Sequence, residues 1–110
     1  MKTVKFLVIA IAAMLMASNS FAQTTTKTET IKVSGNCGQC KDRIEKAAKM
    51  DGVSKADWNK ETKMLTLAYD PSKVKSDDVQ KKIAAVGHDT EKYKADTKTY
   101  NGLPGCCKYR

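Results

Sequence analysis

The sequence predicts an α+β domain with a ferredoxin-like βαββαβ order, in which two helices cover one face of a four-stranded antiparallel sheet. Two patterns carry this prediction. Apolar and polar residues alternate, as in half-buried strands, over 29–34, 53–59 and 64–69. Apolar residues recur at helical spacing over 40–49 and 76–87, so strands and helices follow one another in the required order. A short last strand is expected immediately after the second helix.

The first half of the domain is a strand, a loop and a helix. In the strand, Ile31 and Val33 are expected to point to the core. The loop contains Gly35 and Gly38, which let the backbone turn sharply around Cys37. The helix carries an apolar stripe made of Cys40, Ile44, Ala47 and Ala48. Gly52 marks its end.

The second half begins with a hairpin. Ala56 and Trp58 share one face of its first strand, and a polar turn over 59–63 leads to the second strand. Three residues alternate along that second strand and are predicted to lie in the core: Leu65, Leu67 and Tyr69.

A helix and a short strand complete the predicted domain. Ser76 is expected to be the N-cap of the helix, after the break at Asp70-Pro71-Ser72, and Gly87 ends the helix. Its core face holds Val79, Ile83, Ala84 and Val86. The last strand is placed at 90–94.

Segments of different character flank this domain. Residues 1–22 have the pattern of a cleaved signal peptide: a basic start, an apolar run and the small-x-small motif Ser20-Phe21-Ala22 before Gln23. The apolar run is too short for a transmembrane anchor. Residues 23–28 then form a flexible leader, 29–94 the domain and 95–110 a tail with two cysteines. Apolar and aromatic residues in the tail predict that it packs on the domain.

The chain is basic, with 20 lysines and arginines against 12 acidic residues and a formal net charge of +8. In an intracellular protein this charge would suggest nucleic-acid binding. The predicted export, the even spread of the lysines and the lack of an aromatic pair for base stacking argue against it. We therefore expect no nucleic-acid partner.

All four cysteines lie outside the predicted signal peptide, as the near-neighbour pairs Cys37/Cys40 and Cys106/Cys107. An even number of cysteines in an exported chain usually indicates disulfides. Two such pairs, one at each end of the domain, make a poor loop-closing framework unless they cross-link, however. Adjacent cysteines such as Cys106 and Cys107 bond to each other only with strain. Metal binding and thiol–disulfide exchange therefore have to be weighed against a structural role.

Cys37 and Cys40 lie where a loop enters a helix. The positive end of a helix dipole stabilises thiolates, and Lys41 is expected to add a nearby cation. Thiolates select soft ions such as Cu(I) over hard ones. Two sulfurs leave the ion open to a third thiol, so that it can pass to a partner by ligand exchange.

The alternative interpretation of Cys37 and Cys40 is that they form the active pair of a thiol–disulfide redox protein, because the compartment outside the cytoplasm is oxidising. A thioredoxin-like domain needs a longer chain and a proline-containing strand facing the thiols, and neither Pro71 nor Pro104 fits that place. No serine–histidine–aspartate set, carboxylate pair or phosphate loop is visible in the sequence. The chain is therefore not expected to be an enzyme.

The motif Gly35-Asn36-Cys37-Gly38-Gln39-Cys40, the helix and hairpin after it, and Gly87-His88-Asp89 together resemble the heavy-metal-associated domain. This family includes copper chaperones, metal modules of P-type ATPases and periplasmic mercury-binding proteins. The resemblance covers about residues 28–93 and implies that Cys37 and Cys40 are the metal ligands.

Two departures from the family are visible. The family usually has Met where this chain has Asn36, and a more mobile loop is expected as a result. The family's module normally ends near Tyr93, so the tail with Cys106 and Cys107 lies outside the common pattern.

Three further residues are candidates for an auxiliary role. His88 stands in a loop that lies beside the metal loop in the resembled fold, as either an exposed histidine or a ligand. Cys106 and Cys107 would supply further sulfurs if the tail folds back, and the alternatives are disulfides to Cys37 or Cys40 or between chains. Four thiolates would favour Zn(II) or a small Cu(I) cluster.

The sequence therefore predicts a periplasmic or secreted metal-binding protein that sequesters or transfers a soft ion. Cu(I) is expected first, Hg(II) second and Zn(II) third. The expected partner is a membrane metal transporter or another exported metal protein. The chain is expected to be a monomer, or a dimer bridged by the metal.

Overall fold

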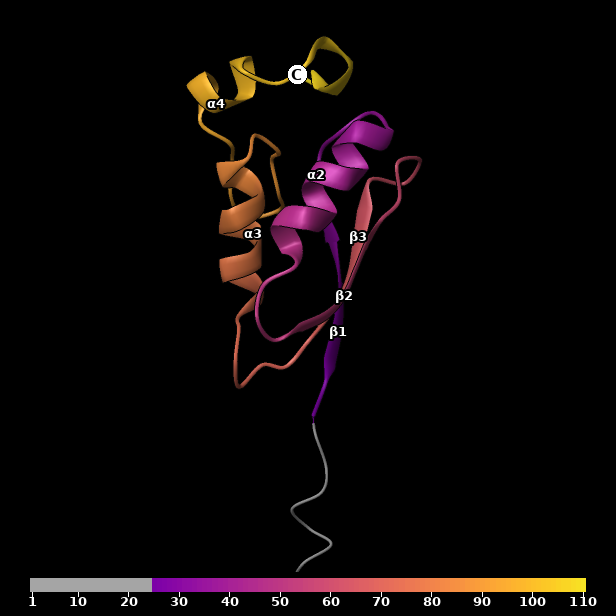
Figure 1. The fold of residues 1–110 in the computed structure, drawn as a ribbon, viewed down its shortest axis with the longest axis vertical. Coiled ribbons are helices and arrows are strands. Elements are labelled where there is room, and N and C mark those ends of the chain that lie inside the picture. Colours follow the sequence, from indigo (N-terminus) through magenta and orange to yellow (C-terminus); the bar gives the residue numbers. More distant parts are fainter. Residues whose placement is uncertain (1–24) are drawn as a thin grey trace, which may run out of the picture.

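The computed structural model describes residues 25–110, which form a three-stranded antiparallel sheet with two helices against one face (Figure 1). The predicted signal peptide and the start of the leader lie outside the described residues. The elements follow in the order β1 (Lys27–Lys32), α2 (Gly38–Ala48), β2 (Val53–Trp58), β3 (Met64–Tyr69), α3 (Ser76–Ala85), α4 (Thr97–Asn101) and the 3₁₀ turn η1 (Gly105–Cys107).

The sheet has the strand order β1-β3-β2, with β3 antiparallel to both neighbours. The predicted hairpin is confirmed: Trp58 lies opposite Leu65 in the β2–β3 pair. Ile31 lies opposite the same Leu65 in the β1–β3 pair, so their side chains share the face that the helices cover. β1 starts at Lys27, inside the predicted leader, and ends at Lys32.

The predicted fourth strand at 90–94 is wrong for the described residues. Its place on the outer edge of β1 holds a single bridge between Val33 and Thr90. Thr90 turns the chain away, because its backbone N–H donates to the carbonyl of Tyr93 at 2.7 Å. The Glu91 carboxylate accepts the N–H of Lys32 at 2.9 Å, the donor that a paired strand would otherwise have used.

The core lies between the sheet and the two helices. Most residues that the sequence assigned to it are buried there, but Ala47 and Ala56 are only partly buried against it and Val86 is not part of it. Trp58 is buried, and its indole N–H donates to the carbonyl of Val33 at 2.9 Å. A Cβ on Gly35 would lie 3.0 Å from the Trp58 ring and 3.1 Å from the Cβ of Cys40. The absence of a side chain at Gly35 therefore lets the cysteine loop lie directly on the core.

The tail is folded and crosses the end of the molecule where α2 begins (Figure 1). Tyr100, Leu103 and Cys107 are buried and belong to the same hydrophobic core as the domain. Leu103 packs on Gly87, the second residue after α3, whose φ of 109° is in the left-handed region that glycine favours. The tail is therefore part of the domain's packing.

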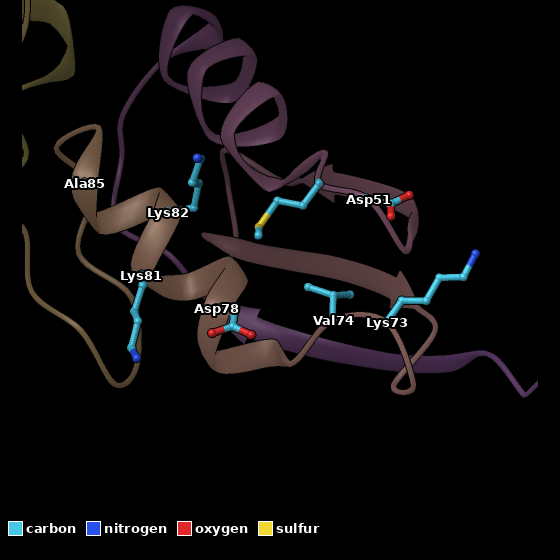
Figure 2. Close-up of a pocket in the computed structure, with 8 residues that line it drawn as sticks. Asp51, Lys73, Val74, Asp78, Lys81, Lys82 and Ala85 are labelled. Atoms are coloured by element: carbon cyan, nitrogen blue, oxygen red, sulfur yellow. The ribbon is translucent and has the colours of Figure 1, made fainter.

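An open hollow lies toward the other end of α2, between α3 and the turns on either side of the hairpin (Figure 2). The residues that line it are Met50, Asp51, Lys73, Val74, Asp78, Lys81, Lys82 and Ala85. Met50 is the one soft ligand among these residues, and none of them is a cysteine or histidine, so the hollow offers no ligand set for a soft ion. Within residues 25–110, the structure contains no helix that is both long and apolar enough to span a membrane.

Candidate metal centre

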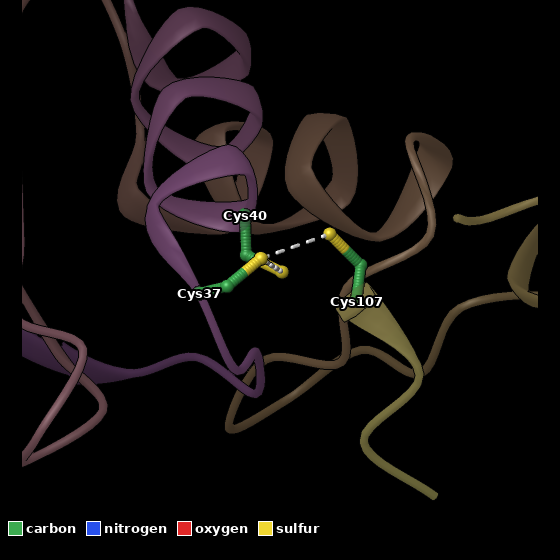
Figure 3. A group of neighbouring side chains, drawn as sticks. All are labelled: Cys37, Cys40 and Cys107. Atoms are coloured by element: carbon green, nitrogen blue, oxygen red, sulfur yellow. Dashed lines mark hydrogen bonds between the residues drawn. The ribbon is translucent and has the colours of Figure 1, made fainter. Parts of the chain in front are cut away.

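The loop before α2 brings the first two sulfurs together. Cys37 is the residue before the helix, with extended backbone angles (φ −136°, ψ 179°), and its carbonyl accepts the N–H of Lys41 at 3.1 Å. Cys40 lies in the first helical turn and is buried. Their Sγ atoms are 3.5 Å apart (Figure 3).

A third sulfur comes from the tail. The Sγ of Cys107, in η1, lies 3.6 Å from the Sγ of Cys37, and Figure 3 shows it facing the pair from the other side. The sulfurs of Cys37, Cys40 and Cys107 all lie within 4.8 Å of one another. All four cysteines are free thiols in this structure. Three thiols in one cluster are a ligand set that suits a soft ion.

The three thiols differ in acidity. The backbone N–H of Cys40 lowers the pKa of Cys37 to about 6, and the neighbouring thiols add to this effect. Burial raises the pKa of Cys40 to about 11. Burial also raises the pKa of Cys107, against the effect of hydrogen bonds from Cys40 and Arg43. Cys37 is therefore the thiol of the cluster that ionises first, and the helix start supplies the cause. The predicted stabilisation of both thiolates holds for Cys37 only, because burial outweighs it at Cys40.

Among the described residues, the cation that contacts a thiol is Arg43 and not the predicted Lys41. A guanidinium N–H of Arg43 donates to the Sγ of Cys107 at 3.3 Å. The ammonium of Lys41 is bound by the carboxylates of Glu45 and Asp57 and by the carbonyl of Trp58. Arg43 follows Cys40 by three residues and so shares its side of the helix, whereas a residue directly after Cys40 does not. That spacing is the signal the sequence reasoning missed.

Cys106 lies next to the cluster and outside it. It is exposed, and its thiol donates to the side-chain oxygen of Gln39 at 3.2 Å. Its Sγ is 3.9 Å from that of Cys107, and the two adjacent cysteines differ in burial, because Cys107 is buried.

His88 is fully buried, so of the two alternatives left open for it, an exposed histidine or a ligand, the exposed one is wrong. Its Nδ1–H donates to the carbonyl of Ser34 at 2.8 Å, and its ring stacks on Tyr109 with centroids 5.7 Å apart. Burial lowers its pKa below the ordinary value for histidine. Its other nitrogen, Nε2, has no hydrogen-bond partner among the described residues. His88 does not belong to the three-sulfur group, and it joins the cysteine loop to the tail.

Asn36 also connects the loop and the tail. Its side-chain amide donates to the carbonyl of Lys108 at 2.7 Å. The hydroxyl of Tyr109 donates to the carbonyl of Gly87 at 2.7 Å and accepts the N–H of Asp89 at 2.8 Å. The polar residue at position 36, where the resembled family usually has Met, thus has a specific partner in the tail.

The model of the heavy-metal-associated domain matches residues 30–89 of this chain. The chain belongs to the heavy-metal-associated domain family. The match contains Cys37 and Cys40 and ends before the tail, so Cys106 and Cys107 lie outside the part that defines the family. The resemblance predicted from the cysteine loop and the order of elements is confirmed.

Among relatives in this family, the chain is 38% identical over 63 residues to the copper chaperone CopZ of Staphylococcus aureus, covering 56% of this chain and 93% of the chaperone. It is 39% identical over 56 residues, half of this chain, to a copper-exporting P-type ATPase of Staphylococcus saprophyticus. It spans only 7% of that ATPase, and 11% of a zinc-transporting ATPase of Synechocystis.

Solved structures of the family have the same fold. A CopZ metallochaperone matches with a TM-score of 0.56 at 36% identity, over 58% of this chain and 98% of that one. Oxidised MerP from Ralstonia metallidurans CH34 matches with a TM-score of 0.57 at 32% identity, over 61% of this chain and 96% of that one. Both are covered almost completely while more than a third of this chain is left over.

Proposed function

We propose that this chain is an exported protein that binds Cu(I) through Cys37 and Cys40 and either sequesters the ion or transfers it to a partner. The observation that carries the proposal is the pair of sulfurs 3.5 Å apart at the start of α2, in a chain of the heavy-metal-associated family. Two thiols at a helix start, one of them half-buried, can take up an ion and release it by ligand exchange.

The choice of ion follows from the ligands. The cluster holds sulfur and no carboxylate or imidazole, which favours Cu(I) and Hg(II) over harder ions. A Zn(II) site would normally have four ligands, and the cluster supplies three. Relatives named as copper chaperone and copper-exporting ATPase support Cu(I) as the first candidate.

Export is proposed from the sequence of residues 1–22. The partner would then be a membrane metal transporter or another exported metal protein. Expression of the full chain in a Gram-negative bacterium, followed by fractionation and N-terminal sequencing, tests this. The expected product is periplasmic or secreted and begins at Gln23. An uncleaved chain in the membrane or the cytoplasm would contradict export.

Metal binding is tested by titrating Cu(I) into the reduced chain Gln23–Arg110 against a chromophoric Cu(I) chelator. We expect the parent to remove Cu(I) from the chelator and the variant Cys37→Ser/Cys40→Ser to fail. If the parent does not compete even with a weak chelator, the metal proposal fails. Metal-independent reduction of a substrate disulfide by the same protein would then favour the redox alternative.

A further inference from the structure

We propose that Cys107 is a third ligand of the metal, so that the ion is bound by three thiolates in a site that the tail closes. This rests on the proposed function and adds to it a ligand from outside the part of the chain that matches the family. A third thiolate would make the site one that retains its ion, in contrast to an open carrier with two thiols.

The sulfur positions suit three ligands better than two. Metal–thiolate bonds are about 2.3 Å long, so an ion at the centre of a sulfur triangle holds its sulfurs about 4.0 Å apart. An ion in line between two sulfurs holds them about 4.6 Å apart. The observed separations are 3.5 Å for Cys37–Cys40 and 3.6 Å for Cys37–Cys107, with all three pairs within 4.8 Å. Binding of an ion by three sulfurs in a triangle therefore requires smaller shifts of the sulfur atoms than linear binding by two.

The position of Cys107 is fixed by contacts that do not involve its sulfur. Leu103 packs so closely on Gly87 that a Cβ there would lie 2.9 Å from the leucine side chain. On the other side of Cys107, the Lys108 carbonyl accepts the Asn36 amide at 2.7 Å. Contacts on both sides of Cys107 thus hold its sulfur at the cluster, where the side chain is 0% exposed.

The charges around the cluster also fit three thiolates. Each thiol that binds the ion gives its proton to solvent, and Cu(I) with three thiolates carries a net charge of −2. Arg43 contacts the Sγ of Cys107 at 3.3 Å and offsets part of this charge. The start of α2 adds a partial positive charge at Cys37 and Cys40. Burial of the third thiolate is therefore compensated within the site.

Release of the ion then requires replacement of Cys107. An incoming thiolate of the partner would form one sulfur–metal bond as the bond to Cys107 breaks, and no electrons are transferred. The tail, by covering the ion on this side, makes that exchange slower than in a site with two thiols.

X-ray absorption of the Cu(I)-loaded chain Gln23–Arg110 tests the proposal, because it counts the sulfur neighbours of the ion. We expect three sulfurs in the parent and two in Cys107→Ser. The matched control is Cys106→Ser, which changes the adjacent, exposed cysteine and should keep three. Cu(I) release to a competing chelator should be at least about tenfold faster in Cys107→Ser than in Cys106→Ser.

Two sulfurs in the parent would overturn the third-ligand proposal and leave the two-thiol proposal intact. A chain that binds no Cu(I) would overturn both. Equal loss of a sulfur in the two single variants would also contradict the assignment to Cys107. The count in the parent depends on no variant, so it decides between two and three sulfurs even if Cys107→Ser is poorly folded. Retention of three sulfurs in Cys106→Ser then excludes Cys106 as the source of the third.

Discussion

The cysteine loop, residues 35–40, and the tail, residues 95–110, each bring two cysteines to the same end of the molecule, but by different means. In the loop, a spacing of three residues across the start of α2 is enough to place two sulfurs 3.5 Å apart. In the tail, adjacent residues diverge: Cys107 is buried against the loop while Cys106 is exposed. The loop therefore depends on local helix geometry, and the tail on contacts with residues distant in the sequence.

The largest expected effect is the loss of stability when the packing of the tail on the domain is weakened. Leu103→Ala removes a buried side chain from the contact with Gly87 and should lower the free energy of unfolding by about 2–4 kcal/mol. Urea denaturation followed by circular dichroism measures it. Lys98→Ala, a change at an exposed position of α4, is the control and should be nearly neutral. A loss under about 1 kcal/mol for Leu103→Ala would mean that the tail is not part of the core.

The same contact can be broken from the domain's side. Gly87→Ala places a Cβ at φ 109° and 2.9 Å from Leu103, so we expect a loss of about 1–3 kcal/mol in unfolding free energy. Gly105→Ala meets no atom within 4 Å and serves as the control within the tail. Thermal unfolding of the two variants should separate them clearly. Equal Tm values would contradict the close packing of tail on domain.

The burial of His88 is expected to make the free energy of unfolding depend on pH. Because burial lowers its pKa in the folded chain, the unfolded chain binds more protons as the pH falls below about 6.5, the ordinary value for histidine. The free energy of unfolding should therefore fall between pH 7 and pH 5, by at most about 1.4 kcal/mol per pH unit for one group. Arg43 opposes protonation and Asp89 favours it.

The variant His88→Gln lacks the titrating ring and should show a flatter stability curve between pH 7 and pH 5 than the parent. Urea denaturation of both proteins at several pH values makes this comparison. An identical slope in the two proteins would exclude His88 as the source of the dependence.

The smallest expected effect concerns the cation at the cluster. Arg43→Gln removes the charge beside the Cys107 sulfur while keeping a polar, uncharged side chain. A hydrogen bond to a charged group contributes about 1.5–3 kcal/mol, and Arg43 is only partly buried, so we expect the lower end of this range, which is about a tenfold fall in Cu(I) affinity. Lys46→Gln, at an exposed position of α2, should leave it unchanged. Competition with a Cu(I) chelator measures the Cu(I) affinity of both variants. Equal affinities of the two would mean that Arg43 does not stabilise the bound ion.

Most of the domain could be predicted from the sequence, because its strands and helices repeat apolar residues at the spacing their own geometry requires. The fourth strand could not. A short segment such as 90–94 has too few residues to show whether it pairs, and here a turn to Tyr93 and the side chain of Glu91 prevent pairing. The α4 helix and the η1 turn carry no periodic pattern of their own.

The two loop cysteines could be placed at the helix start from their spacing alone. The role of Arg43 was accessible in principle, since it shares a helix side with Cys40. The burial of His88 and the choice of Cys107 over Cys106 were not, because they depend on Tyr109, Leu103 and Asn36 meeting residues far along the chain. Nothing in the sequence of adjacent cysteines says which one faces inward.

Cu(I) affinity in a double-mutant cycle tests most directly whether loop and tail form one site. Cys107→Ser is compared in the parent and in Cys37→Ser/Cys40→Ser, with Cys106→Ser as the control. We predict that Cys107→Ser weakens binding by the parent at least about tenfold and has no further effect once the loop thiols are gone. If its effect is the same in both backgrounds, or absent from the parent, the tail thiol and the loop thiols do not share an ion.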